Sequence, residues 1–398
     1  MDACQGKTGS VSSSSSGSQS TKEDSTRYAN RPFETRYGRR FLRDFPYPLP
    51  VDLAELQRQN LRTLLGVTIF GKPICSPLAA QLIPKKVLEI GCGSGYWSSL
   101  CHDYFASRGH SDVSFVGLDV APLAADLQKQ GIDWHFVQHD LRRVPFPFGD
   151  EEFDLIMLKD LSLTIALGDP AQRVVDEVIR TLKCNGVLEI WESDYVLRSL
   201  LPHPPFPPGK VAQDQEVALA TGTFLISTGT PFAPAQNVYI RDSNAWLQEA
   251  FHARDLPPTP CSRVAQVLFQ EPDSLGDIGF RRVAIPLAEM GWEHEAVDDR
   301  KHDSMNSQVG TTPHSNDREH TSDNRLTKEQ AAIRSIALLT VLQTIESLEP
   351  LLKEVSGKNA EEWSYWWAGM MTDLIQQKGA ASGECLEVGA WWARKISS

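Results

Sequence analysis

The sequence predicts a doubly wound α/β fold with a mostly parallel sheet of seven strands. Three observations lead to this prediction. Apolar runs typical of buried strands alternate with helical patterns over residues 85–192. Gly91, Gly93 and Gly95 form a glycine-rich turn directly after the first of these strands. Strand patterns then return at residues 280–287 and 384–395. We therefore expect one domain over residues 36–395.

Composition restricts the kind of protein. The chain has 398 residues, of which 41% are hydrophobic, enough for a sizeable core. A net charge of −12 argues against general affinity for nucleic acid, which depends on Lys and Arg neutralising phosphates. The seven cysteines form no C-x-x-C pair, and no apolar run approaches the ~18 residues of a membrane helix. We expect a cytoplasmic or nuclear protein with a small-molecule or protein partner; the oligomeric state stays open.

The N-terminal part divides into three segments. Residues 1–30 are rich in serine and almost free of apolar side chains, which predicts a disordered tail. The aromatic, proline-rich stretch from Tyr37 to Pro50 predicts an extended surface segment. A helix follows with Asp52 as its N-cap, and its leucines recur on one face while Arg58 falls on the polar face.

The glycine-rich turn predicts a ligand site. Glycine has no Cβ and can take positive φ, so the backbone can approach a ligand closely. A dinucleotide fingerprint would need glycine at position 96, where Tyr96 stands. A phosphate-binding loop would end in Gly-Lys-Ser/Thr, which is also missing from this turn. The spacing therefore argues against a nicotinamide dinucleotide and against a nucleoside triphosphate.

With the glutamate of the preceding strand, the turn reads E-x-G-x-G-x-G. Here the sequence resembles the S-adenosylmethionine-dependent methyltransferases of the Rossmann-like class I fold, closely over residues 85–192 and loosely over 280–395. The long insertions are similar to those of fungal proteins with methyltransferase domains. The resemblance implies S-adenosylmethionine as cofactor, with contacts from Glu89, Gly91, Gly93, Gly95, Asp119, Val120, Asp140, Leu141 and Lys159. It also implies that the helix after Asp52 closes over the cofactor, which makes Arg58 a candidate to approach the cofactor carboxylate; a solvated helix face is the favoured alternative.

Two of these acidic residues have specific expected roles. Asp119 stands at the tip of the second strand, residues 113–120, where a carboxylate can accept hydrogen bonds from both ribose hydroxyls. Asp140 follows the third strand, residues 132–138, and by resemblance accepts from the adenine amino group; a capping role is the alternative. Between these strands, Pro122 to Gln130 predicts a helix that Gly131 ends.

The fourth and fifth strands bring further polar residues to the same edge of the sheet. Residues 153–158 are apolar throughout, which is typical of a central strand covered on both faces. They lead into Lys159 and Asp160, where the resemblance places the sulfonium of the cofactor. A helix beginning at Asp169 and a strand over residues 187–191 then lead to Glu192.

Methyl transfer needs few catalytic residues, because the donor is already activated and the protein mainly aligns the two reactants. If the acceptor is a hydroxyl, Asp160, Glu192 and His102 are the candidates for a base. An ordinary surface or interface role is the favoured interpretation of His102, since no partner residue stands beside it. The spacing of acidic and histidine residues predicts no metal site.

The remaining segments predict additions to the sheet. Residues 195–275 predict a helical insertion, with helices beginning at Ser243 and Ser262, and the resemblance assigns it the role of a substrate lid. Residues 299–325 predict a disordered loop. Helices over 327–355 and 360–378 predict a cap. The second carries an aromatic stripe that would pack onto the sheet or line an acceptor pocket: Trp363, Trp366, Trp367, Met370 and Met371.

The predicted function is therefore an S-adenosylmethionine-dependent methyltransferase. Its acceptor would be an oxygen or nitrogen atom of a small molecule, such as a secondary metabolite, or of a protein. The alternative is a non-catalytic, methyltransferase-like protein with a regulatory or interaction role. The full set of expected cofactor contacts argues against that alternative, because a protein without a ligand has no physical need for it.

Overall fold

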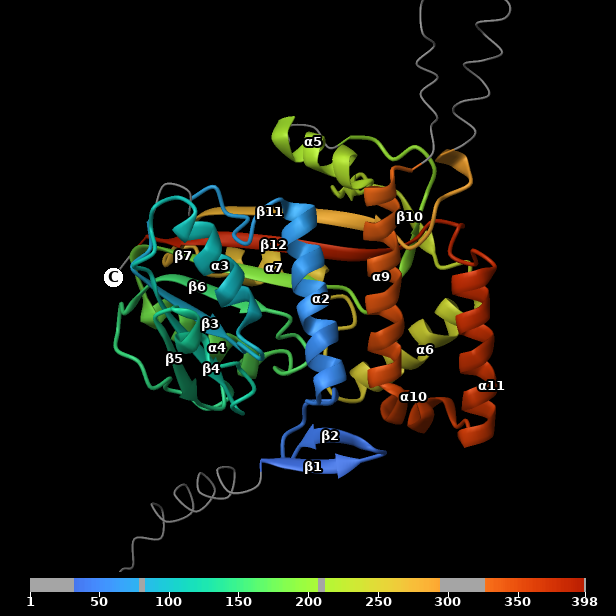
Figure 1. Cartoon of the computed structure of the whole chain (residues 1–398), viewed down its shortest axis with the longest axis horizontal. Helices are drawn as coiled ribbons and strands as arrows, with labels where there is room; N and C mark the ends of the chain where they lie inside the picture. Colours follow the sequence, from blue (N-terminus) through green and yellow to red (C-terminus); the bar gives the residue numbers. More distant parts are fainter. Residues whose placement is uncertain (1–31, 79–82, 207–211, 294–325, 397–398) are drawn as a thin grey trace, which may run out of the picture.

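The structure is a computed structural model that describes residues 32–78, 83–206, 212–293 and 326–396 (Figure 1). The predicted N-terminal tail and the loop predicted over 299–325 lie outside the described residues. Ten strands form the central sheet: β3 (Lys86–Ile90), β4 (Ser114–Asp119), β5 (Trp134–Gln138), β6 (Phe153–Lys159), β7 (Leu182–Ser193), β8 (Arg198–Leu200), β9 (Phe224–Leu225), β10 (Phe232–Pro234), β11 (Leu275–Pro286) and β12 (Glu384–Lys395).

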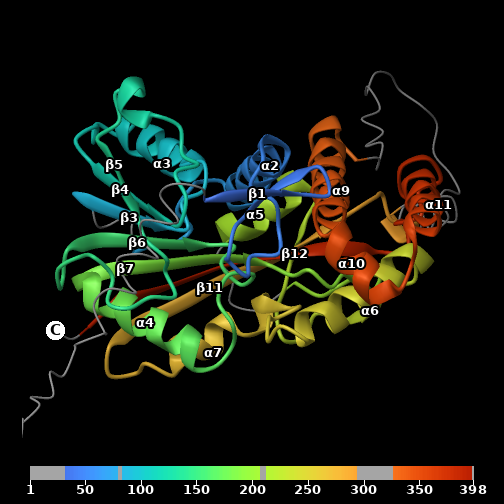
Figure 2. The same ribbon diagram turned by 90° about the horizontal axis from the view of Figure 1, so that it is seen from below.

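Helices cover both faces of this sheet (Figure 2). One face carries α2, α3 and α9, and the opposite face carries α4 and α7. The described helices of four residues or more in α conformation are α2 (Leu53–Phe70), α3 (Tyr96–Ala106), α4 (Asp169–Thr181), α5 (Ala212–Thr221), α6 (Val238–His252), α7 (Val264–Phe269), α9 (Lys328–Ser347), α10 (Glu349–Ser356) and α11 (Ala360–Met371).

The strand order confirms the predicted doubly wound sheet. The strands β5, β4, β3, β6 and β7 lie side by side and run parallel, so β6 is central, as its apolar sequence predicts. The terminal strand β12 runs antiparallel to β7 and separates it from β11. Consecutive parallel strands on either side of β3 therefore end at one common edge, where their connecting loops meet.

The sheet is wider than the predicted seven strands. The three additional strands, β8, β9 and β10, come from the segment predicted to be a helical insertion. Each is two or three residues long. β10 pairs with β8, β8 pairs with β12, and β9 pairs with β11. Such short pairings leave no period-two pattern in the sequence, because the backbone edges of β11 and β12 select them.

Several helix boundaries differ from the prediction. The helix α6 begins at Val238 rather than Ser243, because the Asn237 side chain caps it by accepting from two backbone N–H groups. The helix predicted over Pro122–Gln130 is reduced to one 3₁₀ turn at Leu127–Gln130. The N–H of Ala125 binds the carbonyl of Ser94 instead of a carbonyl within its own segment.

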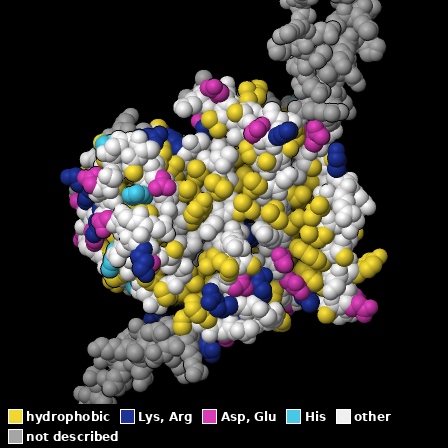
Figure 3. Space-filling model, in the orientation of Figure 1, with side chains coloured by type: hydrophobic (Ala, Val, Ile, Leu, Met, Phe, Trp, Pro, Cys, Tyr) yellow, Lys and Arg dark blue, Asp and Glu magenta, His cyan; other side chains and the backbone are white. Residues whose placement is uncertain are grey.

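The helix predicted over residues 327–355 is divided at Leu348 into α9 and α10. The two axes differ by 65°. No single helix among the described residues is long and apolar enough to span a membrane, and α9 with α10 meets that criterion only as this bent pair. Exposed hydrophobic side chains gather on the face that carries α2 and α9 (Figure 3). The exposed leucines of these two helices include Leu53, Leu64 and Leu339.

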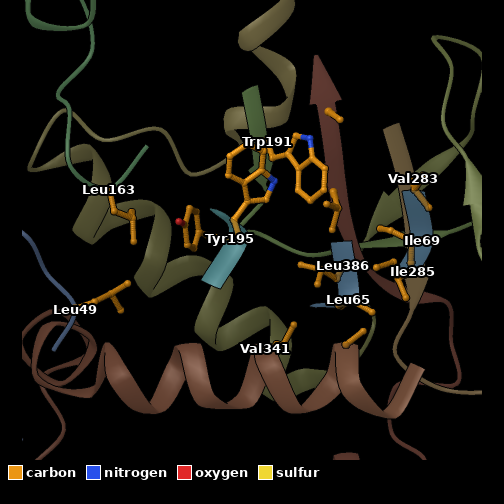
Figure 4. Packing of buried hydrophobic residues seen from close by; sticks show 14 of the residues in the cluster. Leu49, Leu65, Ile69, Leu163, Trp191, Tyr195, Val283, Ile285, Val341 and Leu386 are labelled. Atoms are coloured by element: carbon orange, nitrogen blue, oxygen red, sulfur yellow. The ribbon is translucent and has the colours of Figure 1, made fainter. Parts of the chain in front are cut away.

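The main core lies between the sheet and α2 with α9. Leu65 and Ile69 of α2 point toward the sheet, where Ile285 and Leu386 approach them (Figure 4). The ring of Trp191 packs edge-on against Phe70, with 5.0 Å between the ring centroids. Each fully buried side chain of this size contributes roughly 1.5–3 kcal/mol to stability. This packing fixes α2 across the edge where the glycine turn lies.

The aromatic stripe of α11 packs on α6 rather than on the sheet. The rings of Trp246 and Trp366 are 4.7 Å apart between centroids, and those of Trp363 and Trp366 are 5.1 Å apart. The indole N–H of Trp366 donates to the Asp242 carboxylate at 3.0 Å. The aromatic stripe therefore has a packing role, as predicted. Its partner is α6, a helix of the predicted insertion, and not the sheet.

The segment before α2 forms a hairpin, β1 (Phe33–Arg36) and β2 (Arg39–Leu42), at one end of that helix (Figure 1). Arg39 pairs with Asp52, the N-cap of α2. The backbone N–H of Val51 donates to the carbonyl of Arg40. These contacts hold the connecting stretch, residues 43–51, against the domain.

Candidate functional site

A pocket opens where the parallel strands end. Its volume is about 820 Å³ when the solvent space at its open mouth is included. Its walls are the glycine turn, the ends of β4 and β6, the helix α2, and the stretch that precedes α2. We call it the glycine-loop pocket, and its lining residues include Phe45, Tyr47, Arg58, Gln59, Arg62, Gly91, Gly93, Asp119, Val120, Leu141, Lys159, Asp160, Leu161, Thr164 and Tyr195.

The glycine turn needs glycine for two different reasons. Gly91 and Gly93 both have positive φ, +68° and +49°, a region that other residues rarely adopt. A Cβ atom at Gly91 would also lie only 2.4 Å from the Leu161 side chain. The turn therefore exposes bare backbone to the pocket. Gly95, the third glycine, begins α3 and does not line the pocket.

Asp119 joins the turn to the end of β4. Its carboxylate accepts from the N–H of Gly93 at 2.9 Å and from the N–H of Ala121 at 3.3 Å. Burial raises the pKa of Asp119, although these backbone donors oppose the shift. A carboxylate has about four acceptor positions, more than its backbone donors occupy, so it can also accept from a ligand. Asp119 can thus hold the turn in place and contact a ligand at once.

Besides Gly95, two further predicted cofactor contacts do not line the pocket. Glu89 lies beneath the turn, where it accepts from the Ser98 hydroxyl at 2.6 Å and so ties β3 to α3. Asp140 accepts two hydrogen bonds from the Arg142 guanidinium, at 2.8 and 3.0 Å. Its neighbour Leu141 reaches the pocket in its place. Asp140 also accepts from the backbone N–H of Arg142 at 3.0 Å, the type of contact expected of a capping residue.

Lys159 and Asp160 lie at the end of β6 and form an ion pair. Lys159 Nζ is 3.0 Å from Asp160 Oδ2, and Asp160 has a left-handed backbone with φ of +54°. Burial alone would raise the pKa of Asp160, but the positive charges of Lys159 and Arg62 outweigh it and hold the pKa below its usual value. The pocket therefore contains a carboxylate that stays ionised.

The other two candidate bases lie elsewhere. Glu192 accepts from the N–H groups of Leu161 and Ser162 and from the Ser162 hydroxyl, so it shapes the turn beside Asp160. Burial, and next the charge of Asp160, raise the pKa of Glu192 to about 8. His102 lies on α3 against Phe115 and does not line the pocket. Of the three candidates, the structure brings only Asp160 to it.

Two arginines of α2 line the pocket, and of these the sequence singled out Arg58 but not Arg62. Arg58 is buried and makes two hydrogen bonds to Glu55, at 2.7 and 2.9 Å. Arg62, one turn later, is only 6% exposed, and its Nε has no hydrogen-bond partner in the described structure. Together with Gln59, these residues form a polar stripe at helical spacing. That spacing is the available signal, but it is equally typical of a solvated face.

The described residues contain no group of three histidine, cysteine or acidic side chains that could hold a metal ion. Among the described residues of the predicted lid, 195–275, Tyr195 lines the glycine-loop pocket. Phe45, Tyr47 and Leu49, which precede α2, also line it. The N-terminal side of the domain thus contributes an aromatic part of the lining.

The buried Glu89 predicts a pH-dependent stability. Burial raises its pKa to about 7, against about 4.3 in an unfolded chain, so the folded state retains a proton that the unfolded state has lost. This contribution is full below about pH 4 and is lost as the pH rises through about 7. In the wild type this loss lowers the free energy of unfolding as the pH rises. We expect the free energy of unfolding of Glu89→Gln to fall less steeply, by up to about 1.4 kcal/mol per pH unit between about pH 5 and 7.

Urea unfolding of the full chain at about pH 5, 6 and 7 measures this slope. The matched control is Glu216→Gln, which changes an exposed glutamate of α5 and should leave the slope as it is. Equal slopes in the wild type and in Glu89→Gln would show that Glu89 is ionised in the folded protein.

Residues 87–186 match the family model described as "Methyltransferase domain". No curated protein matches the chain significantly. One similar solved structure is phosphoethanolamine N-methyltransferase 2 of Haemonchus contortus in complex with phosphomonomethylethanolamine and S-adenosylhomocysteine, with 11% identity over 87% of this chain and 61% of that one and a TM-score of 0.35.

Two further similar structures cover less of this chain. The CMeT domain of citrinin polyketide synthase has 20% identity over 28% of this chain and 29% of that one, with a TM-score of 0.24. A protein of Pyrococcus horikoshii has 23% identity over 38% of this chain and 64% of that one, with a TM-score of 0.26. In the first four matches the chain spans between 29% and 64% of the other protein's length.

The family match coincides with the part of the sheet that borders the pocket. It covers the glycine turn, the parallel strands β3 to β6 and the first residues of β7. Beyond it, β12 lies antiparallel beside β7. Residues 87–186 therefore match a methyltransferase domain, within a sheet that has the doubly wound topology predicted for the Rossmann-like class I fold.

Proposed function

We propose that this protein uses S-adenosylmethionine to methylate an oxygen or nitrogen atom of a small molecule. The observation that carries the proposal is that Arg62 and Asp119 line the same pocket. The cofactor has a carboxylate at one end and ribose hydroxyls in its middle. A buried guanidinium whose Nε has no partner suits the first, and a carboxylate with free acceptor positions suits the second.

The other residues around the pocket fit the rest of the cofactor. The exposed backbone of Gly91 and Gly93 gives room for close contact with the cofactor. Val120 and Leu141 offer apolar surface for its adenine ring. Glu89 and Gly95 would act indirectly, by holding the turn and α3. Lys159 would add positive charge near the bound carboxylate. When bound, the cofactor supplies a methyl group on a sulfonium that an acceptor lone pair can displace in line.

Asp160 would act through its charge rather than as a strong base. A carboxylate whose pKa is held low accepts protons poorly, but it remains negative where a cation must be accommodated. The aromatic side chains of Phe45 and Tyr47 would exclude water from the reacting atoms. The site therefore favours an acceptor that is nucleophilic by itself or loses its proton readily.

The test is calorimetric titration of the full chain with S-adenosylmethionine, repeated on Arg62→Met. We expect the variant to bind about 10- to 100-fold more weakly, because a hydrogen bond to a charged group contributes roughly 1.5–3 kcal/mol. Its free energy of unfolding should not decrease, since the substitution removes a buried cation whose Nε has no hydrogen-bond partner.

Arg241→Met is the matched control, because Arg241 is an exposed helical arginine on α6 outside the pocket. Equal affinities of both variants and the wild type would remove Arg62 from the site. Absence of any binding by the folded wild type would support the second candidate, a non-catalytic protein that keeps the methyltransferase fold. A protein acceptor is the alternative substrate, to be compared with small molecules once cofactor binding is measured.

A further inference from the structure

A second pocket adjoins the glycine-loop pocket. It lies between the β1–β2 hairpin, the stretch that follows the hairpin, the beginning of α4, and α10, and its volume is about 1400 Å³ including its open mouth. Phe45, Tyr47 and Thr164 line both pockets. These three side chains therefore border both pockets and connect the two sites. We call it the arginine-lined pocket.

Positive charge dominates this pocket although the whole chain carries a net charge of −12. Four arginines line it, and Glu354 is its only acidic lining residue among those described. Arg36 and Arg142 already pair with Glu34 and Asp140, which do not line it. Arg254 donates from Nη1 to the Ala250 carbonyl at 3.0 Å, and its Nη2 lies 3.5 Å from the exposed Glu354, a long contact, as expected of a weak surface ion pair.

Arg173 has no such partner. It is exposed on α4 and makes no hydrogen bond or ion pair within the described structure. Arginine is well suited to bind carboxylates and phosphates, because its planar fork donates two parallel hydrogen bonds. Arg173 and the weakly paired Arg254 therefore leave donors available for an anion inside the pocket.

The rest of the lining is apolar and aromatic. Phe45 lies under the Arg142 guanidinium at 4.0 Å from its ring centroid, and Phe41 lies under Arg36 at 4.6 Å. Leu163, Leu256 and Leu351 add aliphatic surface. A fully hydrophilic anion would leave this surface without contacts, whereas a neutral apolar molecule would leave the arginines unused. The lining fits a molecule that has both parts.

We propose that the arginine-lined pocket binds the methyl acceptor, and that this acceptor is a small organic anion with an apolar body and a carboxylate or phosphate group. The acceptor role rests on the proposed function. In the transfer, a lone pair of the acceptor oxygen or nitrogen bonds to the methyl carbon. The carbon–sulfur bond breaks with its electron pair on sulfur, and the acceptor proton leaves to water. The arginines hold the anionic group away from the reacting atom.

The experiment is calorimetric titration of the full chain with three matched probes: 1-naphthaleneacetate, 1-naphthyl phosphate and the neutral 1-naphthaleneethanol. We expect either or both anions to bind at least about tenfold more tightly than the alcohol. Arg173→Gln should weaken anion binding about five- to tenfold and leave the alcohol unchanged. Arg241→Gln, the matched exposed arginine, should change neither. The two anions distinguish a carboxylate site from a phosphate site.

A second arm tests the acceptor role. Because three side chains line both pockets, S-adenosylhomocysteine should tighten binding of the preferred anion about fivefold, and the anion should tighten cofactor binding equally. Equal effects of Arg173→Gln and Arg241→Gln would overturn the anion site. If Arg173→Gln weakens anion binding but S-adenosylhomocysteine does not change it, the acceptor role is overturned. Anion binding by a protein that binds no cofactor would refute the proposed function while the anion site stands.

Discussion

Asp119→Ala is expected to weaken binding of S-adenosylmethionine at least about 100-fold in calorimetric titration of the full chain. Two effects add. The substitution removes the carboxylate positions proposed to accept from the ribose hydroxyls, and it leaves the Gly93 N–H without its 2.9 Å acceptor. Each hydrogen bond to a charged group contributes roughly 1.5–3 kcal/mol, so losing two exceeds a hundredfold in affinity.

Two further variants separate these effects. Asp119→Asn retains one acceptor oxygen for the turn but removes the charge, so we expect an intermediate loss of about tenfold. Asp112→Ala, in the exposed turn before β4, is the matched control and should bind as the wild type does. An Asp119→Ala protein that is folded by circular dichroism and binds with unchanged affinity would refute the site.

Arg58→Met is expected to lower the free energy of unfolding by about 3–5 kcal/mol. The Glu55 side chain is fully buried, and Arg58 donates to both of its carboxylate oxygens. The remaining donors, from Gln59 and Ser347, are neutral. Without Arg58, a buried negative charge would stay uncompensated, or the carboxyl would have to take up a proton.

Urea unfolding at about pH 7 measures this loss, and two comparisons test its cause. Glu55→Gln combined with Arg58→Met should recover most of the stability, because no buried charge then remains. Arg62→Met is the matched arginine one turn along the same helix and should not destabilise the protein. If both single arginine variants lost equal stability, packing of the long side chains rather than charge would explain the loss.

The two arginines show why the sequence could not divide structural from ligand-binding roles. Both are buried on the same face of α2, four residues apart. Arg58 meets Glu55 on its own helix and Thr344 on α9, whereas no described residue accepts from Nε of Arg62. The difference depends on where α9 lies, nearly 300 residues later in the sequence, and local periodicity carries no information about such contacts.

The candidate bases illustrate the same limit. Parallel strands end at a common edge, so the sequence brings Asp160 and Glu192 to one region of the fold. It does not give the direction of either side chain. In the structure the Glu192 carboxylate accepts hydrogen bonds from the N–H groups of the turn after Asp160. Asp160 itself lines the pocket.

The sequence by itself determined the parallel sheet and its glycine turn, because buried strands need continuous apolar runs and the turn needs residues without Cβ at positive φ. It also determined the range of the last strand, which is β12, Glu384–Lys395. Only the tertiary structure decided the strands β8 to β10, the packing of α11 on α6, and the aromatic wall that Phe45 and Tyr47 place between two pockets. These features depend on contacts between distant segments, and long-range packing overrides what a short stretch of sequence prefers.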